Sequence, residues 1–203
     1  MTEEYPLDLQ EAIRFHGHMC PGLAIGYRAA KAVQAYLQVE RPEDEELVAI
    51  VESDGCGVDA IQFILGCTLG KGNLIYQDKG KQAYTLINRK QGRAVRAIAK
   101  PGLFDRTPEQ EAAFGKVMSG TATEEEMALF RAFQKERVIE LLAADQEKLF
   151  TVMEVSPEVP KKARIFKSVT CEYCGEPVME PRARVREGKV ACLDCSEVYS
   201  RGW

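Results

Sequence analysis

The sequence predicts an α+β protein, in which a mixed core of helices and strands is followed by a small cysteine-rich unit. Apolar residues recur with helical spacing in some segments and form short β-branched runs in others. Several strand-like runs follow one another without intervening helices, which favours a mixed sheet over a doubly wound parallel sheet. Four of the seven cysteines lie after residue 170. They indicate a second unit whose stability comes from a metal.

The first part of the chain contains three helix-like segments and one strand. Residues 7–14 predict a short helix, and residues 21–38 predict a largely apolar helix that should be mostly buried. Leu47–Val51 is a short β-branched run bounded by charged residues, which is typical of a buried strand. Residues 57–66 then predict a second buried helix.

The rest of the core continues with strands and ends with helices. Three strands are expected at residues 73–77, 83–88 and 94–99, the last two forming a hairpin through residues 89–93. Two helices, at residues 108–119 and 123–148, and a final strand at 149–155 complete this part. The second of these helices begins with Thr-Glu-Glu-Glu at Thr123, which fits a capping box. Met127, Phe130 and Phe133 form a helical stripe on it, which we expect to serve packing and a dimer surface.

The domain organisation follows from a change in composition. The stretch Ser-Pro-Glu-Val-Pro-Lys-Lys, which starts at Ser156, is typical of a linker. We therefore expect a core domain at residues 1–155, a linker at 156–167 and a zinc ribbon at 168–203. A chain of 203 residues is long enough for one sizeable core and such an appendage.

The cysteines of the second unit have the spacing of a structural zinc site. Two CxxC pairs flank a stretch of 17 residues, and their members are Cys171, Cys174, Cys192 and Cys195. Four thiolates complete a tetrahedral shell around Zn²⁺ and leave no open position, so this ion would be structural. Two disulfides or a rubredoxin-like iron site are the alternatives.

Between these pairs, residues 178–186 and 189–191 are expected to form a hairpin. Arg182, Arg184 and Arg186 alternate along one face of the first strand. A ribbon that binds nucleic acid is therefore an alternative, although a solvated strand is favoured because the basic excess is small.

Composition limits the classes of function and location. The formal net charge is −4 and the pI is about 5.4, which gives no general reason to expect nucleic acid as a partner. The acidic N-terminus lacks the apolar region of a secretory signal, and no apolar run approaches the roughly 20 residues of a membrane span. An odd number of cysteines with two CxxC pairs favours metal binding in a reducing compartment, so we expect a cytoplasmic protein that does not enter a membrane.

The two histidines of the chain lie together with a cysteine near the N-terminus. His16, His18 and Cys20 alternate, so an extended backbone would point all three to one side. Pro21 suits the first position of a helix, which makes Cys20 the expected N-cap. A thiol at that place should have a lowered pKa. The alternative is two surface histidines beside a buried cysteine.

The second buried helix carries one polar stripe. Cys56, Asp59 and Gln62 lie at i, i+3 and i+6, and a buried carboxylate needs a partner. A cavity shared with the histidines would supply it; alternatively, Asp59 favours the first turn of its own helix. Cys67 lies about 16 Å along the same helix from Cys56, too far to share an ion, and is expected to be a buried small side chain.

The loop after this helix contains Lys71 between two glycines. Its spacing is one residue short of a Walker A motif, and Gly72 replaces the required hydroxyl residue. A generic anion- or cofactor-binding role of Lys71 and the loop amides is the remaining expectation.

The two core segments resemble a known family. FHGHMCPGLAIGYRAA at residues 15–30 and CGVDAIQFILGCTLGKGN at residues 56–73 resemble the FmdE family, which takes its name from a component of formylmethanofuran dehydrogenase. The resemblance implies an α+β core in which both segments line a shared cleft. It also implies a homodimer, and a C-terminal zinc ribbon is familiar from the family.

The resemblance supports a site rather than a reaction. The formylmethanofuran reaction depends on a molybdenum or tungsten pterin and on iron–sulfur clusters that other subunits carry. This chain has no set of cysteines for a ferredoxin cluster, so alone it is not expected to be that dehydrogenase.

The leading functional hypothesis is a transition-metal cleft, most simply for Zn²⁺, in addition to the structural zinc. We expect His18, Cys20 and Cys56 to be the ligands and His16 and Asp59 to supply acid–base chemistry, although either histidine could be the ligand. The protein would be an enzyme or an accessory subunit linked to molybdenum or tungsten enzymes. The alternatives are a metal or cofactor carrier that docks to a partner, a zinc-ribbon nucleic-acid binder, and a thiol oxidoreductase that uses Cys20 and Cys56.

Overall fold

The fold is described from a computed structural model, which describes residues 5–197. The chain divides into two compact units, Met1–Lys162 and Ala163–Trp203, and each unit is described by itself. The first part of the proline-containing segment packs on the first unit, because the guanidinium of Arg89 donates a hydrogen bond to the carbonyl of Pro160.

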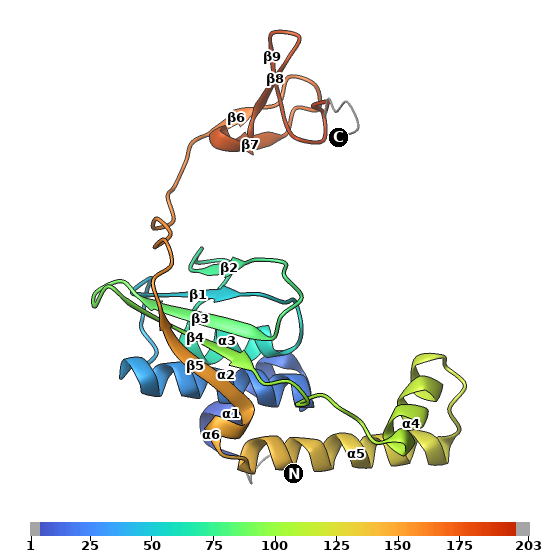
Figure 1. Cartoon of the computed structure of the whole chain (residues 1–203). Coiled ribbons are helices and arrows are strands. Elements are labelled where there is room, and N and C mark those ends of the chain that lie inside the picture. Colours follow the sequence, from blue (N-terminus) through green and yellow to red (C-terminus); the bar gives the residue numbers. More distant parts are fainter. Residues whose placement is uncertain (1–4, 198–203) are drawn as a thin grey trace. The chain divides into compact units, whose positions relative to one another are not determined.

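The first unit contains a five-stranded mixed sheet with the order β2-β1-β3-β4-β5 (Figure 1). The strands are β1 (Leu47–Val51), β2 (Leu74–Tyr76), β3 (Ala83–Asn88), β4 (Arg93–Ala99) and β5 (Phe150–Val155). Strand β1 pairs in parallel with β2, and the other three neighbouring pairs are antiparallel. The mixed sheet confirms the α+β class, and the expected strands lie within two residues of the observed bounds.

Six helices accompany this sheet in the part of the chain that the structure describes. They are α1 (Leu7–His16), α2 (Pro21–Leu37), α3 (Gly57–Leu65), α4 (Pro108–Met118), α5 (Glu124–Ala143) and α6 (Gln146–Leu149). Helices α1, α2 and α3 lie on one side of the sheet, where the main hydrophobic core forms (Figure 1). Within residues 5–197, none of the helices combines the length and apolar character that a membrane crossing requires.

The opposite face of the sheet buries a smaller apolar cluster and one charged pair. Val48, Ile50, Ile87 and Ala94 form the cluster. Beside it, the Glu52 side chain is only 5% exposed and accepts two hydrogen bonds from Arg96, at 2.8 and 3.0 Å. Hydrogen bonding to this guanidinium is the main cause that lowers the pKa of Glu52. The pair therefore holds strands β1 and β4 together across β3.

Helices α2 and α3 cross at a pair of glycines. A Cβ atom placed on Gly26 would lie 2.1 Å from the carbonyl oxygen of Gly57, and one placed on Gly57 would lie 2.4 Å from the hydroxyl of Tyr84. Neither position can accept a side chain unless the backbone moves, because real Cβ atoms essentially never approach this closely. The glycine pair brings the N-terminal ends of α2 and α3 together.

The last helical region corrects one expectation. The sequence predicts one helix over residues 123–148, but α5 ends at Ala143, Ala144 is extended and α6 starts at Gln146. The guanidinium of Arg28, on α2, donates hydrogen bonds to the carbonyls of Leu141, Leu142 and Ala144 at 2.6–2.8 Å. A distant residue thus satisfies the carbonyls at the end of α5, which local spacing could not reveal.

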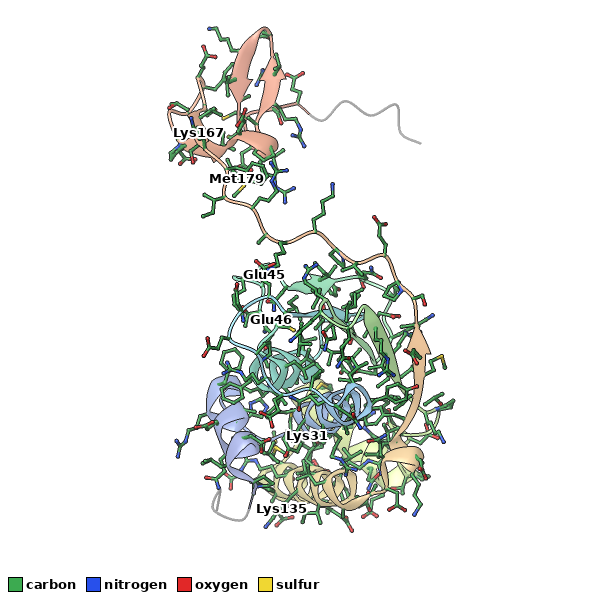
Figure 2. The ribbon with its side chains drawn as sticks, turned by 90° about the vertical axis from the view of Figure 1, so that its left-hand side faces the viewer. Lys31, Glu45, Glu46, Lys135, Lys167 and Met179 are labelled. Atoms are coloured by element: carbon green, nitrogen blue, oxygen red, sulfur yellow. The ribbon has the colours of Figure 1, made fainter. Side chains whose placement is uncertain are left out.

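The second unit consists of two small hairpins. Its elements are β6 (Ser168–Thr170), β7 (Pro177–Met179), η1 (Glu180–Arg182), β8 (Arg184–Arg186) and β9 (Lys189–Ala191). The expected strand over residues 178–186 is wrong, because a 3₁₀ turn that contains Pro181 interrupts it. Strand β7 pairs instead with β6, where Met179 lies opposite Ser168; Lys167 and Met179 are labelled in Figure 2.

Candidate metal centre

Three potential metal ligands meet where α1, α2 and α3 approach one another. His16, Cys20 and Cys56 each offer one ligand atom, and these atoms lie within 4.8 Å of one another. His16 and Cys20 are partly buried, whereas Cys56 is exposed. Such a group combines a closed inner side with one side open to solvent.

Local backbone features place each of these side chains. Helix α1 ends at His16 because Gly17 is in the left-handed region with φ +98°, which is favourable for glycine. Cys20 is the N-cap of α2, as expected: Pro21 is the first helical residue, and the Cys20 sulfur accepts a hydrogen bond from the Leu23 N–H at 3.4 Å. Cys56 immediately precedes α3 and makes no side-chain cap.

The imidazole of His16 is oriented by a carboxylate. Its Nδ1 lies 2.6 Å from Oδ2 of Asp59, and its side chain is only 10% exposed. Since a carboxylate can only accept, Nδ1 carries the proton. The lone pair is then on Nε2, which lies 3.9 Å from the Cys20 sulfur. This carboxylate–histidine arrangement is the one that orients metal-binding histidines.

Gly22 provides the space for the two cysteines to meet. A Cβ atom on this residue would lie 3.1 Å from Cβ of Cys56, and 3.7 and 3.8 Å from the sulfur atoms of Cys56 and Cys20. Any side chain would therefore crowd both thiols. The sequence offered a signal for this role, since Gly22 is one turn before Gly26 on the same face of α2.

The thiol of Cys20 differs from its expected chemistry. Its pKa is raised, not lowered, in the protein without a metal. Burial is the largest cause, the proximity of Cys56 adds to it, and the hydrogen bond from Leu23 opposes it. The helix N-terminus thus does not outweigh the loss of solvation at this position.

The other histidine lies beside this group rather than within it. The ring of His18 is 4.7 Å from that of His16, and His18 is exposed. The sequence pattern favours His18 as the ligand and His16 and Asp59 as acid–base groups. In the structure, His16 has the ligand position, Asp59 holds its Nδ1 proton, and His18 lies at the solvent side.

Two further residues that the sequence singles out lie outside this group. Cys67 is fully buried, its sulfur donates to the carbonyl of Leu65 at 3.6 Å, and burial raises its pKa to about 12. The ammonium of Lys71 is 3.5 and 3.4 Å from the carbonyls of Glu43 and Asp44, just before the labelled Glu45 and Glu46 in Figure 2. Both therefore have structural contacts.

The second unit brings its four cysteines together as the spacing predicts. One sulfur atom from each of Cys171, Cys174, Cys192 and Cys195 lies within 4.8 Å of the others. The Cys192 N–H donates to the Cys171 sulfur at 3.3 Å. Backbone N–H groups, chiefly that of Cys174, lower the pKa of Cys171 to about 6. Such N–H donors stabilise the thiolate form, which is the form that binds zinc.

The arginines of this unit do not form the expected continuous stripe. Arg182 lies in the 3₁₀ turn. The guanidinium of Arg186 donates to the carbonyl of Cys195 at 2.9 Å and pairs with Glu197 at 3.2 Å. It also lies over the ring of Tyr173. Arg186 is therefore engaged within its own unit.

Two protein families match the chain. The sequence model described as "FmdE, Molybdenum formylmethanofuran dehydrogenase operon" matches residues 15–151. The one described as "Prokaryotic dksA/traR C4-type zinc finger" matches residues 164–201. The two matches correspond to the unit with the His–Cys group and to the unit with four cysteines.

Individual proteins are also similar. A protein of Archaeoglobus fulgidus named "Probable S-adenosyl-L-methionine-binding protein" is 35% identical over 198 residues, which are 94% of this chain and 53% of that protein. The chain thus spans about half the length of this curated relative. The crystal structure of an FmdE-like protein of tungsten formylmethanofuran dehydrogenase, from Syntrophus aciditrophicus, superimposes with a TM-score of 0.61 at 23% identity, covering 96% of this chain and 91% of that one. This likeness supports the fold.

Proposed function

The chain belongs to the FmdE family, and we propose that it is a metalloprotein whose core centre binds a transition metal, most simply Zn²⁺, through His16, Cys20 and Cys56. The observation that carries this proposal is the convergence of three ligand atoms within 4.8 Å of one another, with Asp59 on the far nitrogen of His16. Two thiolates and one imidazole form a known ligand set of catalytic zinc, in which a fourth position stays open.

The residues present fit a metal by their chemistry. The two sulfur atoms and Nε2 are donors that suit zinc, and Nδ1 is engaged by a carboxylate as in other metal-binding histidines. The pKa of Cys20 is raised by its burial and by Cys56. A dication beside two crowded thiols would favour their thiolate forms and so relieve this penalty.

The side chains divide the remaining work. When bound, a zinc ion with an open position supplies Lewis-acid chemistry, polarising a carbonyl or activating water. Asp59 keeps the Nδ1 proton of His16 in place, so that Nε2 faces inward. His18 is exposed, lies beside His16 and has a titratable ring, so we assign to it the acid–base role at the open side.

The C-terminal unit has a structural role in this proposal. Its four thiolates would enclose one Zn²⁺ and stabilise about 40 residues that have a very small core. Residues 163–197 contain six basic and six acidic residues, and a tetrathiolate site adds negative charge. This balance favours a protein partner over nucleic acid for this unit.

The partners are part of the same proposal. The family description and the name of the Syntrophus protein refer to formylmethanofuran dehydrogenase, so we propose that this chain works as an accessory subunit beside molybdenum- or tungsten-dependent enzymes of that class. We also propose a homodimer. The exposed apolar side chains of α4 and α5, which include Met118, Leu129 and Ile139, support a covered surface on these helices.

Metal stoichiometry tests the centre directly. Full-length protein should contain two metal ions per chain, and Cys56→Ala should contain one. Cys67→Ala is the matched control, because Cys67 belongs to the same segment but lies outside the ligand group. Elemental analysis of both variants, with circular dichroism to confirm folding, gives the answer. Two ions in folded Cys56→Ala, or one ion in the wild-type protein, would refute the core centre.

A further inference from the structure

The helix that carries Asp59 also carries a residue with no assigned role, Gln62. Its side-chain Nε2 donates to Oδ1 of Asp59 at 3.2 Å, and its Oε1 accepts from the backbone N–H of Leu69 at 3.3 Å. Gln62 is partly buried and lies three residues after Asp59, so the two side chains share one face of α3.

The direction of the Gln62 amide follows from its partners. A backbone N–H can only donate, so Leu69 requires the oxygen of the amide on its side. The nitrogen must then face Asp59. Because the other Asp59 oxygen is 2.6 Å from His16, both oxygens of the carboxylate have a donor. The chain of hydrogen bonds therefore runs from the loop at Leu69, through Gln62 and Asp59, to His16.

This chain of bonds restricts the rotation of Asp59. The carboxylate is 37% exposed, so without a second donor it would turn toward water and exchange its bond with His16 for solvent. The Gln62 amide is the fixed donor for its second oxygen. We infer that Gln62 is a positioning residue, which holds the Asp59 carboxylate so that His16 keeps its proton on Nδ1 and presents Nε2 to the two cysteines.

The metal-binding part of this inference rests on the proposed function, but its orienting part does not. The tautomer of His16 is a property of the protein without metal, and it can be read from the ¹⁵N shifts of the imidazole. The chain has two histidines, so the His18→Ala variant identifies the His16 signals.

The decisive variant is Gln62→Glu. It keeps the size of the side chain and an oxygen acceptor for the Leu69 N–H, but it replaces the donor that faces Asp59 by a second carboxylate oxygen. If Gln62 only anchored the loop, this change would be neutral. If Gln62 positions Asp59, the two carboxylates repel each other and the orientation of Asp59 is lost. Gln62→Ala removes both bonds, and Gln34→Ala, a partly buried glutamine of α2, is the control.

Two readouts decide the outcome. At neutral pH the metal-free wild type should show His16 with the proton on Nδ1, and Gln62→Glu should shift the signals toward the other tautomer or a mixture. Competition with a chromophoric chelator should show core zinc bound roughly tenfold more weakly in Gln62→Glu, at the lower end of outer-sphere effects. Gln34→Ala should match the wild type in both measurements.

The results separate the two proposals. A wild-type His16 spectrum in both Gln62→Glu and Gln62→Ala would overturn the role of Gln62, whether or not the core binds zinc. A changed tautomer in a protein that binds only the ribbon metal would support Gln62 as the residue that orients His16 and would refute the metal centre instead.

Discussion

Oδ2 of Asp59 lies 2.6 Å from Nδ1 of His16, although the two residues are 43 positions apart in the chain. The contact ties the end of α1 to the first turn of α3. It also fixes which nitrogen of the imidazole can face Cys20 and Cys56. One hydrogen bond thus connects the packing of two helices with the chemistry of the candidate centre.

Replacing Asp59 should weaken metal binding without removing a ligand. In Asp59→Asn, the amide can donate as well as accept, so the Nδ1–H tautomer of His16 loses its preference. We expect about a 10- to 100-fold loss in affinity for the core zinc, the range seen when outer-sphere partners of ligands are changed. Chelator competition measures it. Asp54→Asn, at an exposed carboxylate in the loop before Cys56, is the control and should keep wild-type affinity.

The two histidines should respond differently to the same substitution. His16→Ala removes a proposed ligand and should lower the metal content from two ions to one per chain. His18→Ala should retain both ions, because its exposed ring lies outside the group of ligand atoms. Elemental analysis of the two purified variants distinguishes them. Loss of the ion from His18→Ala alone would show that the two assignments must be exchanged.

The glycine crossing of α2 and α3 should be sensitive to one added methyl group. A Cβ on Gly57 would lie 2.4 Å from the Tyr84 hydroxyl, so Gly57→Ala should destabilise the protein by about 1–3 kcal/mol through overpacking. Gly115→Ala, in α4, meets no atom within 4 Å and should be stabilising by up to ~1 kcal/mol. Urea unfolding monitored by circular dichroism compares the two. Equal stability of both variants would contradict the close crossing.

The buried pair of Glu52 and Arg96 should make stability depend on pH. The folded-state pKa of Glu52 is lowered, so its contribution is present above the pKa of the unfolded chain and is lost as the pH falls through the folded-state pKa. Glu52→Gln should cost about 1–3 kcal/mol at pH 7. Its deficit should shrink below about pH 4, where the wild-type carboxylate gains a proton.

An exposed pair on the same sheet provides the comparison for this pH effect. Glu154 and Arg93 lie 2.9 Å apart, but both side chains are more than 40% exposed. Glu154→Gln should therefore show no measurable loss at either pH. Denaturant titrations at pH 7 and pH 4 give all the required free energies. A Glu52→Gln deficit that stays the same at both pH values would contradict the proposed titration.

Local patterns were sufficient for most of the fold. The run Leu47–Val51 and the strand of residues 83–88 match their expected bounds, because β-branched and apolar runs are read over a few residues. The cap at Cys20 was predictable for the same reason, since Pro21 fixes the helix start. What failed depended on distant groups. The end of α5 is set by Arg28, more than 100 residues earlier.

The candidate site divides along the same line. The sequence indicates which residue types gather near the N-termini of α2 and α3. It does not indicate that Asp59 takes His16 rather than His18 as its partner, because that choice depends on how α1 ends at Gly17 and packs against α3. The raised pKa of Cys20 was missed for a related reason: it comes from burial and from Cys56, which lies 36 residues away.

The spacing of the ligands also sets an order in time. The ribbon cysteines lie within 25 residues, and each CxxC pair is nearly adjacent, so this site can capture an ion while much of the chain is still unfolded. The core ligands come from three helices, and they converge only when α3 has docked on α2. Metal uptake by the core is then a late step of folding, and its rate would report the docking of these two helices.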